Sequence, residues 1–155
     1  MNKGDAFAFL TIGLLAGCGI VDGSKSDLSP LSFEIREGNY FGPPQPQIGL
    51  IVSTEKQYPC MNYQLDGTLG VAPPTFRVDF LGTVSIGQIC LTAIGPAQFK
   101  TALPVTNGTY TLEFRRNDVT DRYRIIVRSN AIDVVTLQAH FTHPTASRFP
   151  RLTGP

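Results

Sequence analysis

Large apolar residues alternate with polar ones at a period of two in four places, which predicts β-strands with one buried face. The apolar members of these sets are Leu31, Phe33 and Ile35; Phe76, Val78 and Phe80; Tyr110, Leu112 and Phe114; and Tyr123, Ile125 and Val127. Less regular apolar runs at 48–52, 84–91 and 132–137 indicate strands that are buried on both faces or bent by glycine. The pattern therefore predicts about seven to nine short strands.

Between these runs lie short groups of Gly, Pro, Asn and Asp, whose backbone preferences end strands. The groups are Gly42-Pro43-Pro44, Asp66-Gly67, Pro73-Pro74, Gly95-Pro96 and Asn107-Gly108. The chain contains no long amphipathic helical pattern, although residues 96–103 are compatible with a single helical turn. We expect an all-β domain over residues 31–155, built as an antiparallel β-sandwich of two packed sheets.

The segment 103–114 reads Leu-Pro-Val-Thr-Asn-Gly-Thr-Tyr-Thr-Leu-Glu-Phe. Gly108 permits a positive φ, and the Tyr110 hydroxyl is placed to hydrogen-bond back to the turn. This segment resembles the strand entry of immunoglobulin-like and prealbumin-like sandwiches, which implies an immunoglobulin-like architecture. A hairpin loop at 115–121, a strand at 123–128 and a turn at Ser129-Asn130 then predict a three-stranded meander. Because such sandwiches host unrelated functions, the resemblance implies architecture only.

The N-terminus has the pattern of a secretory signal peptide, with an uncharged apolar run at 6–16. At ~1.5 Å per helical residue this run spans about 17 Å, much less than the ~30 Å hydrocarbon core of a membrane. It ends in Leu15-Ala16-Gly17-Cys18, which resembles the lipobox of bacterial lipoproteins. The resemblance implies cleavage before Cys18 and attachment of acyl chains such as palmitate to that residue. Ordinary secretion with cleavage nearby is the alternative.

The same resemblance carries an expectation about location. In the Gram-negative family an Asp after the lipidated cysteine commonly retains the protein in the inner membrane, and this chain has Gly19 there. We therefore expect an outer-membrane lipoprotein of the cell envelope. Small polar residues follow as far as Pro30 and are typical of a flexible tether. The expected regions are a signal peptide at 1–17, a lipidated N-terminus and tether at 18–30, and the β-domain at 31–155.

With Cys18 assigned to lipid, two thiols remain, Cys60 and Cys90. An even number of cysteines in an exported domain favours a disulfide. A reactive thiol or a metal-binding pair is the rival interpretation, but the chain has no C-x-x-C motif and neither cysteine has a His nearby in the sequence.

Composition and motifs provide little evidence for catalysis. A formal net charge of +1 gives no electrostatic reason to bind nucleic acid. His140 and His143 form an H-x-x-H pattern, but odd spacing on a strand sends them to opposite faces, so we expect no metal site. The candidate carboxylate pairs are Asp66 with Asp79 and Glu34 with Glu37. No nucleophile, phosphate-binding or dinucleotide motif is present, and we predict no catalytic residue and no cofactor.

One cluster of charges and one group of aromatics remain as candidate binding surfaces. The arginines of the cluster are Arg115, Arg116, Arg122, Arg124 and Arg128, interleaved with Glu113, Asp118 and Asp121. Mixed signs on neighbouring strands favour a solvated, ion-paired surface over an anion or lipid-headgroup patch. The aromatics are Tyr40, Phe41, Tyr58 and Tyr63, the first candidates for stacking on a ligand.

The favoured interpretation is a non-catalytic lipoprotein that is attached to the membrane by lipid and that has a structural or interaction role toward an envelope protein. The alternatives are a small-ligand or glycan-binding module, which would use the four aromatics, and an envelope hydrolase, which would need polar groups converging in a cleft.

Overall fold

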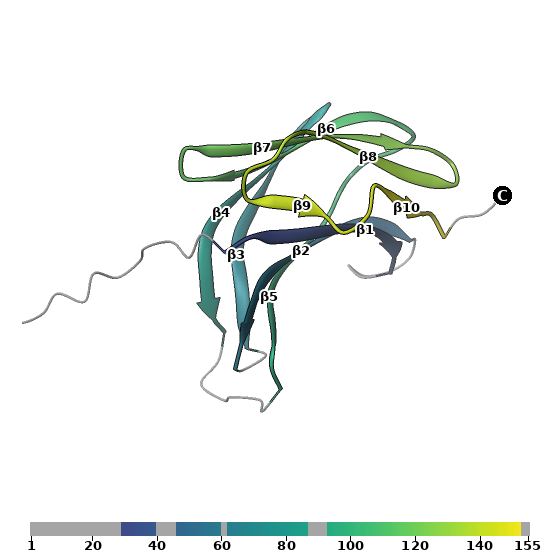
Figure 1. The fold of residues 1–155 in the computed structure, drawn as a ribbon. Coiled ribbons are helices and arrows are strands. Elements are labelled where there is room, and N and C mark those ends of the chain that lie inside the picture. Colours follow the sequence, from purple (N-terminus) through teal and green to yellow (C-terminus); the bar gives the residue numbers. More distant parts are fainter. Residues whose placement is uncertain (1–28, 40–45, 60–61, 87–92, 153–155) are drawn as a thin grey trace, which may run out of the picture.

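The computed structural model describes residues 29–39, 46–59, 62–86 and 93–152. Within these ranges every regular element is a β-strand, which confirms the all-β prediction (Figure 1). The strands are β1 (Leu31–Gly38), β2 (Gln47–Tyr58), β3 (Tyr63–Ala72), β4 (Thr75–Ser85), β5 (Gly95–Ala102), β6 (Gly108–Arg116), β7 (Val119–Val127), β8 (Ala131–Gln138), β9 (Thr142–Pro144) and β10 (Arg148–Pro150). They form a single hydrogen-bonded sheet in the order β10-β8-β7-β6-β4-β3-β5-β2-β1-β9.

The sheet curls over itself, so that β6, β7 and β8 lie across from β1 (Figure 1). Four strands separate β1 from β6 in the sheet, yet the ring centroid of Phe33 lies 4.9 Å from that of Phe114 and 4.8 Å from that of Tyr123. The concave face therefore forms one core. The period-two sets predicted to be buried are confirmed, because all of their members are buried except the half-buried Tyr110.

The segment 142–150 joins the two edges of the curled sheet. β9 pairs in parallel with β1, and β10 pairs antiparallel with β8. Between them the Thr145 amide donates to the Phe33 carbonyl at 2.8 Å, and the Ser147 carbonyl accepts from the Val134 amide at 2.8 Å. The segment from Thr142 to Pro150 therefore supplies both edge strands of the sheet.

The pairing differs from a purely antiparallel sandwich. β4 and β6 are parallel over six residue pairs, from Thr75 opposite Thr111 to Phe80 opposite Arg116. β1 with β9 is also parallel, and β3 meets β5 in parallel at one residue pair. The two packed sheets that the sequence predicted are here the two halves of one curled sheet, because β3 and β5 continue the hydrogen bonding from one half to the other.

The predicted meander of β6, β7 and β8 is confirmed, with antiparallel pairing at both junctions. Its first turn is tighter than the expected loop at 115–121: β6 runs to Arg116, β7 starts at Val119, and Asn117 adopts a φ of 52°. Asn tolerates this left-handed conformation because its short side chain bonds locally. At the entry to β6, the Tyr110 hydroxyl accepts from the Thr106 amide at 3.2 Å and donates to the Thr106 carbonyl at 3.1 Å, as predicted.

Three local predictions were wrong. Residues 96–102 lie in strand β5, so they form no helical turn. The apolar run at 84–91 continues as a strand only to Ser85, while Ile86 is exposed and 87–92 lie outside the described residues. The Asp66-Gly67 pair, which was expected to end a strand, lies inside β3. The register with β4 shifts there instead, which is a β-bulge.

Gly67 is needed at this bulge for close packing. A Cβ on Gly67 would lie 3.0 Å from Phe80 Cδ1 and 3.3 Å from Phe99 Cδ2, nearer than real Cβ atoms normally come. Both rings are buried, and they meet edge to face. The bulge therefore brings the β3 backbone directly against the core.

We expect Gly67→Ala to lower the free energy of unfolding by about 1–3 kcal/mol, because the added methyl overpacks two buried rings. Urea titration of the purified domain measures this change. Gly70→Ala is the matched control in the same strand, since its nearest non-neighbour atom would be the Arg77 carbonyl oxygen at 3.7 Å. Equal urea midpoints for the two variants would contradict this prediction.

Candidate functional site

Asp121 is a carboxylate that accepts hydrogen bonds from three consecutive residues, His140, Phe141 and Thr142. It was expected on a solvated surface, but it is fully buried in β7. Its Oδ2 accepts from the Phe141 amide at 3.0 Å, the Thr142 amide at 2.7 Å and the Thr142 hydroxyl at 2.6 Å. Its Oδ1 accepts from the His140 amide at 2.7 Å. The carboxylate thus holds the chain reversal that leads into β9.

Burial raises the pKa of the Asp121 carboxyl, but hydrogen bonds from Thr142, Phe141 and His140 outweigh burial, so the pKa lies below its usual range. The buried Tyr123 ring reaches the same corner, where its hydroxyl donates to the Thr142 carbonyl at 2.6 Å. Burial raises the pKa of this phenol. The Asp121 carboxylate and the Tyr123 hydroxyl therefore both hold β9 in place through hydrogen bonds to Thr142.

The two histidines contact separate carboxylates. His140 Nδ1 lies 2.9 Å from Asp121 Oδ1, and His143 Nε2 lies 3.5 Å from Glu55 Oε1. Over residues 29–39, 46–59, 62–86 and 93–152, no three His, Cys, Asp or Glu side chains gather in a way that could hold a metal ion.

The remaining charges of the predicted cluster form ladders across the strands. Glu113 is buried and accepts from Arg77 at 2.8 Å and from Arg122 at 3.1 Å. Burial raises the pKa of Glu113, but these two arginines outweigh it and lower the pKa overall. Other pairs join Arg115 to Asp79 and Arg128 to Asp133. The outer face of β4, β6 and β7 is therefore a paired surface.

Of the candidate carboxylate pairs, three members are held by arginines. Glu34 pairs with Arg36 at 2.8 Å, and Asp79 pairs with Arg115. The buried Glu37 accepts from Arg151 Nε at 3.1 Å and Nη2 at 2.8 Å, a two-pronged contact.

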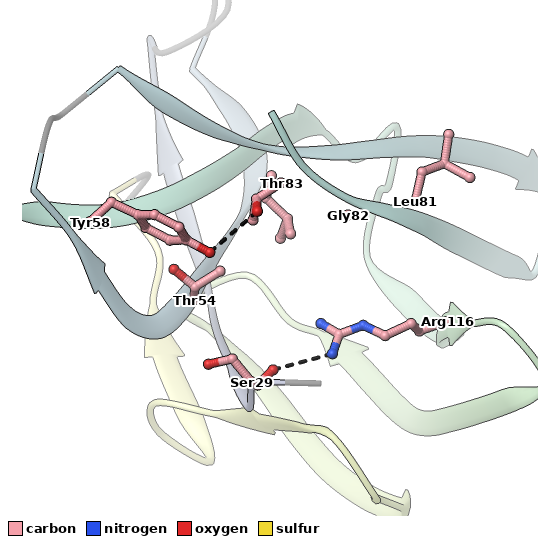
Figure 2. Close-up of a pocket in the computed structure, with 8 residues that line it drawn as sticks. Ser29, Thr54, Tyr58, Leu81, Gly82, Thr83 and Arg116 are labelled. Atoms are coloured by element: carbon pink, nitrogen blue, oxygen red, sulfur yellow. Dashed lines mark hydrogen bonds between the residues drawn. The ribbon is translucent and has the colours of Figure 1, made fainter. Parts of the chain in front are cut away.

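Arg116 closes one end of the core beside the start of the described chain. It is buried, its guanidinium lies 4.9 Å from the Phe141 ring centroid, and its Nη1 donates to the Ser29 carbonyl at 3.2 Å. Figure 2 shows Arg116 and Ser29 on one side of a small cavity, with Tyr58 and Thr83 joined on the other side at 3.3 Å. The cavity measures about 20 Å³, enough for a single water molecule.

The predicted aromatic group divides between described and undescribed residues. Tyr40 and Phe41 lie outside the described residues. Tyr58 is buried and stacks on the half-buried Tyr63, with ring centroids 4.5 Å apart and planes inclined by 23°. One face of each of these two rings is therefore covered by the other ring. Cys18, Cys60 and Cys90 also lie outside the described residues.

A wider groove lies at the opposite end of β1 from Ser29. It measures about 720 Å³, and its floor is mainly apolar, with Ile48, Leu69, Val71, Leu103 and Val105. Its charged lining residues, Glu37 and Arg151, bind each other, and Arg151 also donates to the Arg128 carbonyl at 3.0 Å. The groove is therefore an apolar recess whose two charged lining residues are paired with each other.

Sequence reasoning missed the buried roles of Glu37, Arg116 and Asp121, although a signal was present. Each lies two residues beyond a period-two apolar set: Glu37 after Ile35, Arg116 after Phe114, and Asp121 before Tyr123. Continuing the alternation puts all three on the buried face, where they are found at the ends of the core.

Comparison with protein-family models, curated proteins and solved structures finds no match to this chain. The described residues contain no helix able to cross a membrane.

Proposed function

We propose that this chain is a lipid-anchored protein of the cell envelope, held in the outer membrane through acylated Cys18, with a non-catalytic β-domain that has a structural or interaction role. The observation that carries the proposal is the uncharged apolar run at 6–16 that ends in Leu15-Ala16-Gly17-Cys18. A thiol at this position is the nucleophile that can attack the glyceryl carbon of a phospholipid, forming a thioether with the diacylglyceryl group as the phosphate headgroup leaves, and small residues before it allow cleavage. Two or three acyl chains hold a protein firmly at a membrane.

The fold supports this arrangement at the point where the domain begins. Ser29 is fixed by Arg116, and the Pro30 carbonyl accepts from the Glu55 amide at 3.0 Å. Cys18 precedes Ser29 by 11 residues, so a tether of ten residues connects the lipidated cysteine to an immobilised point on the domain. The acyl chains would set the membrane address while the tether gives limited reach.

A non-catalytic role is supported by the state of the polar groups in the described recesses. In the wide groove, Glu37 and Arg151 neutralise each other. In the small cavity there is space for one water, which leaves no room for a substrate. Glu37 and Arg151 are the only charged side chains among the described residues that line the wide groove, whereas a hydrolase would need convergent polar groups that face the cleft.

The resemblance to immunoglobulin-like and prealbumin-like sandwiches belongs to this proposal as its architectural part. It is supported by the Tyr110 contact to Thr106 and by the β6–β7–β8 meander. The parallel β4–β6 pairing limits it, because the expected sandwich is antiparallel.

We also propose that Cys60 and Cys90 form a disulfide in the exported protein. The described strand ends on either side of both cysteines support it. Tyr58 pairs with Gly95 across β2 and β5, and the Ile86 amide donates to the Asn62 carbonyl at 2.7 Å. The two connections that carry the cysteines therefore start and end at neighbouring positions of the sheet.

The intact mass of protein extracted from membranes tests the proposed function. We expect loss of residues 1–17 together with added acyl mass in the native chain, and no acyl mass in Cys18→Ala. Fractionation is expected to move Cys18→Ala out of the membrane pellet. A native chain without acyl mass, or one that retains Met1, would overturn the lipoprotein assignment.

A further inference from the structure

One end of the curled sheet exposes large apolar side chains beside the point where the tether enters. The apolar tip consists of Leu81, Val84 and Ile86 at the end of β4, and of Ile94 just before β5. All four are exposed, with Ile86 at 64% and Ile94 at 71%. Leu81 lines the same small cavity as Ser29, so the tip starts next to the first described residue (Figure 2).

The sequence around the tip is unusually free of charge. From Phe80 to Phe99, 20 consecutive residues contain no Asp, Glu, Lys or Arg. Leu152, which is also exposed, has Arg151 beside it in the sequence. Charged groups resist transfer from water into an apolar phase, whereas uncharged apolar side chains gain from it. The composition of the tip therefore matches a lipid interface better than it matches water.

The length of the tether places the tip within reach of the bilayer. Ten residues separate Cys18 from Ser29. A linker of that length, if rich in small polar residues, has ends about 18 Å apart on average and reaches roughly 36 Å at most. Along β2, the tip end at Tyr58 lies three residues beyond Glu55, which binds Pro30. At about 3.3 Å per residue this is about 10 Å. The acylated cysteine can therefore sit in the membrane while the tip touches its surface.

We infer that the apolar tip is a second membrane contact, which inserts Leu81, Val84, Ile86 and Ile94 into the interface of a phospholipid bilayer. This inference rests on the proposed lipidation of Cys18, because the acyl chains bring the tip to the surface. With the tip inserted, the domain stands in a defined orientation. The groove beside Glu37 and Arg151, at the other end of β1, then faces away from the membrane.

The experiment uses the absence of Trp from the chain, so that one introduced Trp reports on its own site. Ile94→Trp places the probe in the tip. Leu152→Trp is the matched control, since Leu152 is exposed to the same 71% and its amide binds Glu37 at the far end of β1. Both full-length, lipidated proteins are reconstituted into phosphatidylethanolamine and phosphatidylglycerol vesicles with or without brominated acyl chains.

We expect brominated lipid to lower the emission of Ile94→Trp at least twofold, with a blue shift, and to leave Leu152→Trp unchanged. Ile86→Trp is expected to behave like Ile94→Trp. Acylated protein whose Ile94→Trp emission is unquenched would overturn the tip contact and leave the lipoprotein assignment standing. Protein without acyl mass would overturn both. A blue shift that follows protein concentration and ignores lipid would show that a second copy covers the tip, and would also overturn the inference.

Discussion

Replacing Asp121 with Asn is expected to cost about 3 kcal/mol or more of unfolding free energy, because hydrogen bonds to a buried charged acceptor contribute roughly 1.5–3 kcal/mol each. The Asp121 carboxylate accepts from three backbone amides and the Thr142 hydroxyl. An Asn side chain keeps one oxygen and turns an NH₂ group toward the remaining N–H donors. The amides of the 140–142 reversal would then be left buried without an acceptor.

The unfolding free energy lost in Asp121→Asn is expected to decrease as the pH falls. The folded state lowers the pKa of Asp121, so its contribution to stability is fully present above the unfolded value of about 4. That contribution falls as pH drops through the lower folded value, because the unfolded chain then binds more protons than the folded one. The stability gap between the native chain and Asp121→Asn should therefore narrow in acid. Glu113, whose pKa is also lowered, acts in the same direction in both proteins and leaves the gap unaffected.

Urea unfolding between neutral pH and pH 3 measures this gap. Asp118→Asn is the matched control, since Asp118 is exposed in the tight turn before β7. It is expected to change stability by less than about 0.5 kcal/mol at every pH, as surface substitutions usually do. A neutral-pH cost for Asp121→Asn as small as that of Asp118→Asn, or a gap that widens in acid, would show that the carboxylate does not hold the β9 reversal.

The predictable part of this fold is the part determined by neighbours along the chain. Side chains on a strand alternate between two faces whatever the strand pairs with, so Phe33, Phe76 and Leu112 could be assigned to the core from spacing alone. The Tyr110 contact was equally local, since it spans four residues. The same local rule, extended by one step, would have found Glu37, Arg116 and Asp121.

The sequence could not predict the partners of those buried charges, because the partners lie far away along the chain. Glu37 meets Arg151 across 114 residues of chain, and Arg116 meets Ser29 across 87. Such contacts depend on how the sheet curls and on the parallel β4–β6 pairing, which no spacing pattern encodes. The turn predicted at Asp66-Gly67 was wrong because the reason for the glycine is also a long-range contact. Gly67 packs closely against Phe80, and a glycine needed for such packing cannot be distinguished in the sequence from a glycine in a turn.

Reducing the proposed Cys60–Cys90 disulfide is expected to cost about 3 to 4 kcal/mol, because the bond closes a loop of roughly 31 residues and restricts the unfolded chain. Urea midpoints are compared with and without reductant in a Cys18→Ala background, so that the lipidation site contributes no thiol. The variant with Cys60→Ser and Cys90→Ser serves as the control: it should unfold at the reduced midpoint and ignore the reductant.

The proposed disulfide would hold together one end of the curled sheet. Its two connections adjoin the ends of β2, β3, β4 and β5, the same end of the sheet that exposes Ile86 and Ile94. Val84, Ile86 and Ile94 are exposed at this end, so loop closure would add stability where these described side chains bury little apolar surface. Reduction should therefore raise amide hydrogen exchange first at 55–58 and 83–86, before exchange rises in β6 and β7. Uniform exchange across the sheet, or an oxidised protein in which both thiols alkylate without reductant, would rule out a disulfide that holds this end together.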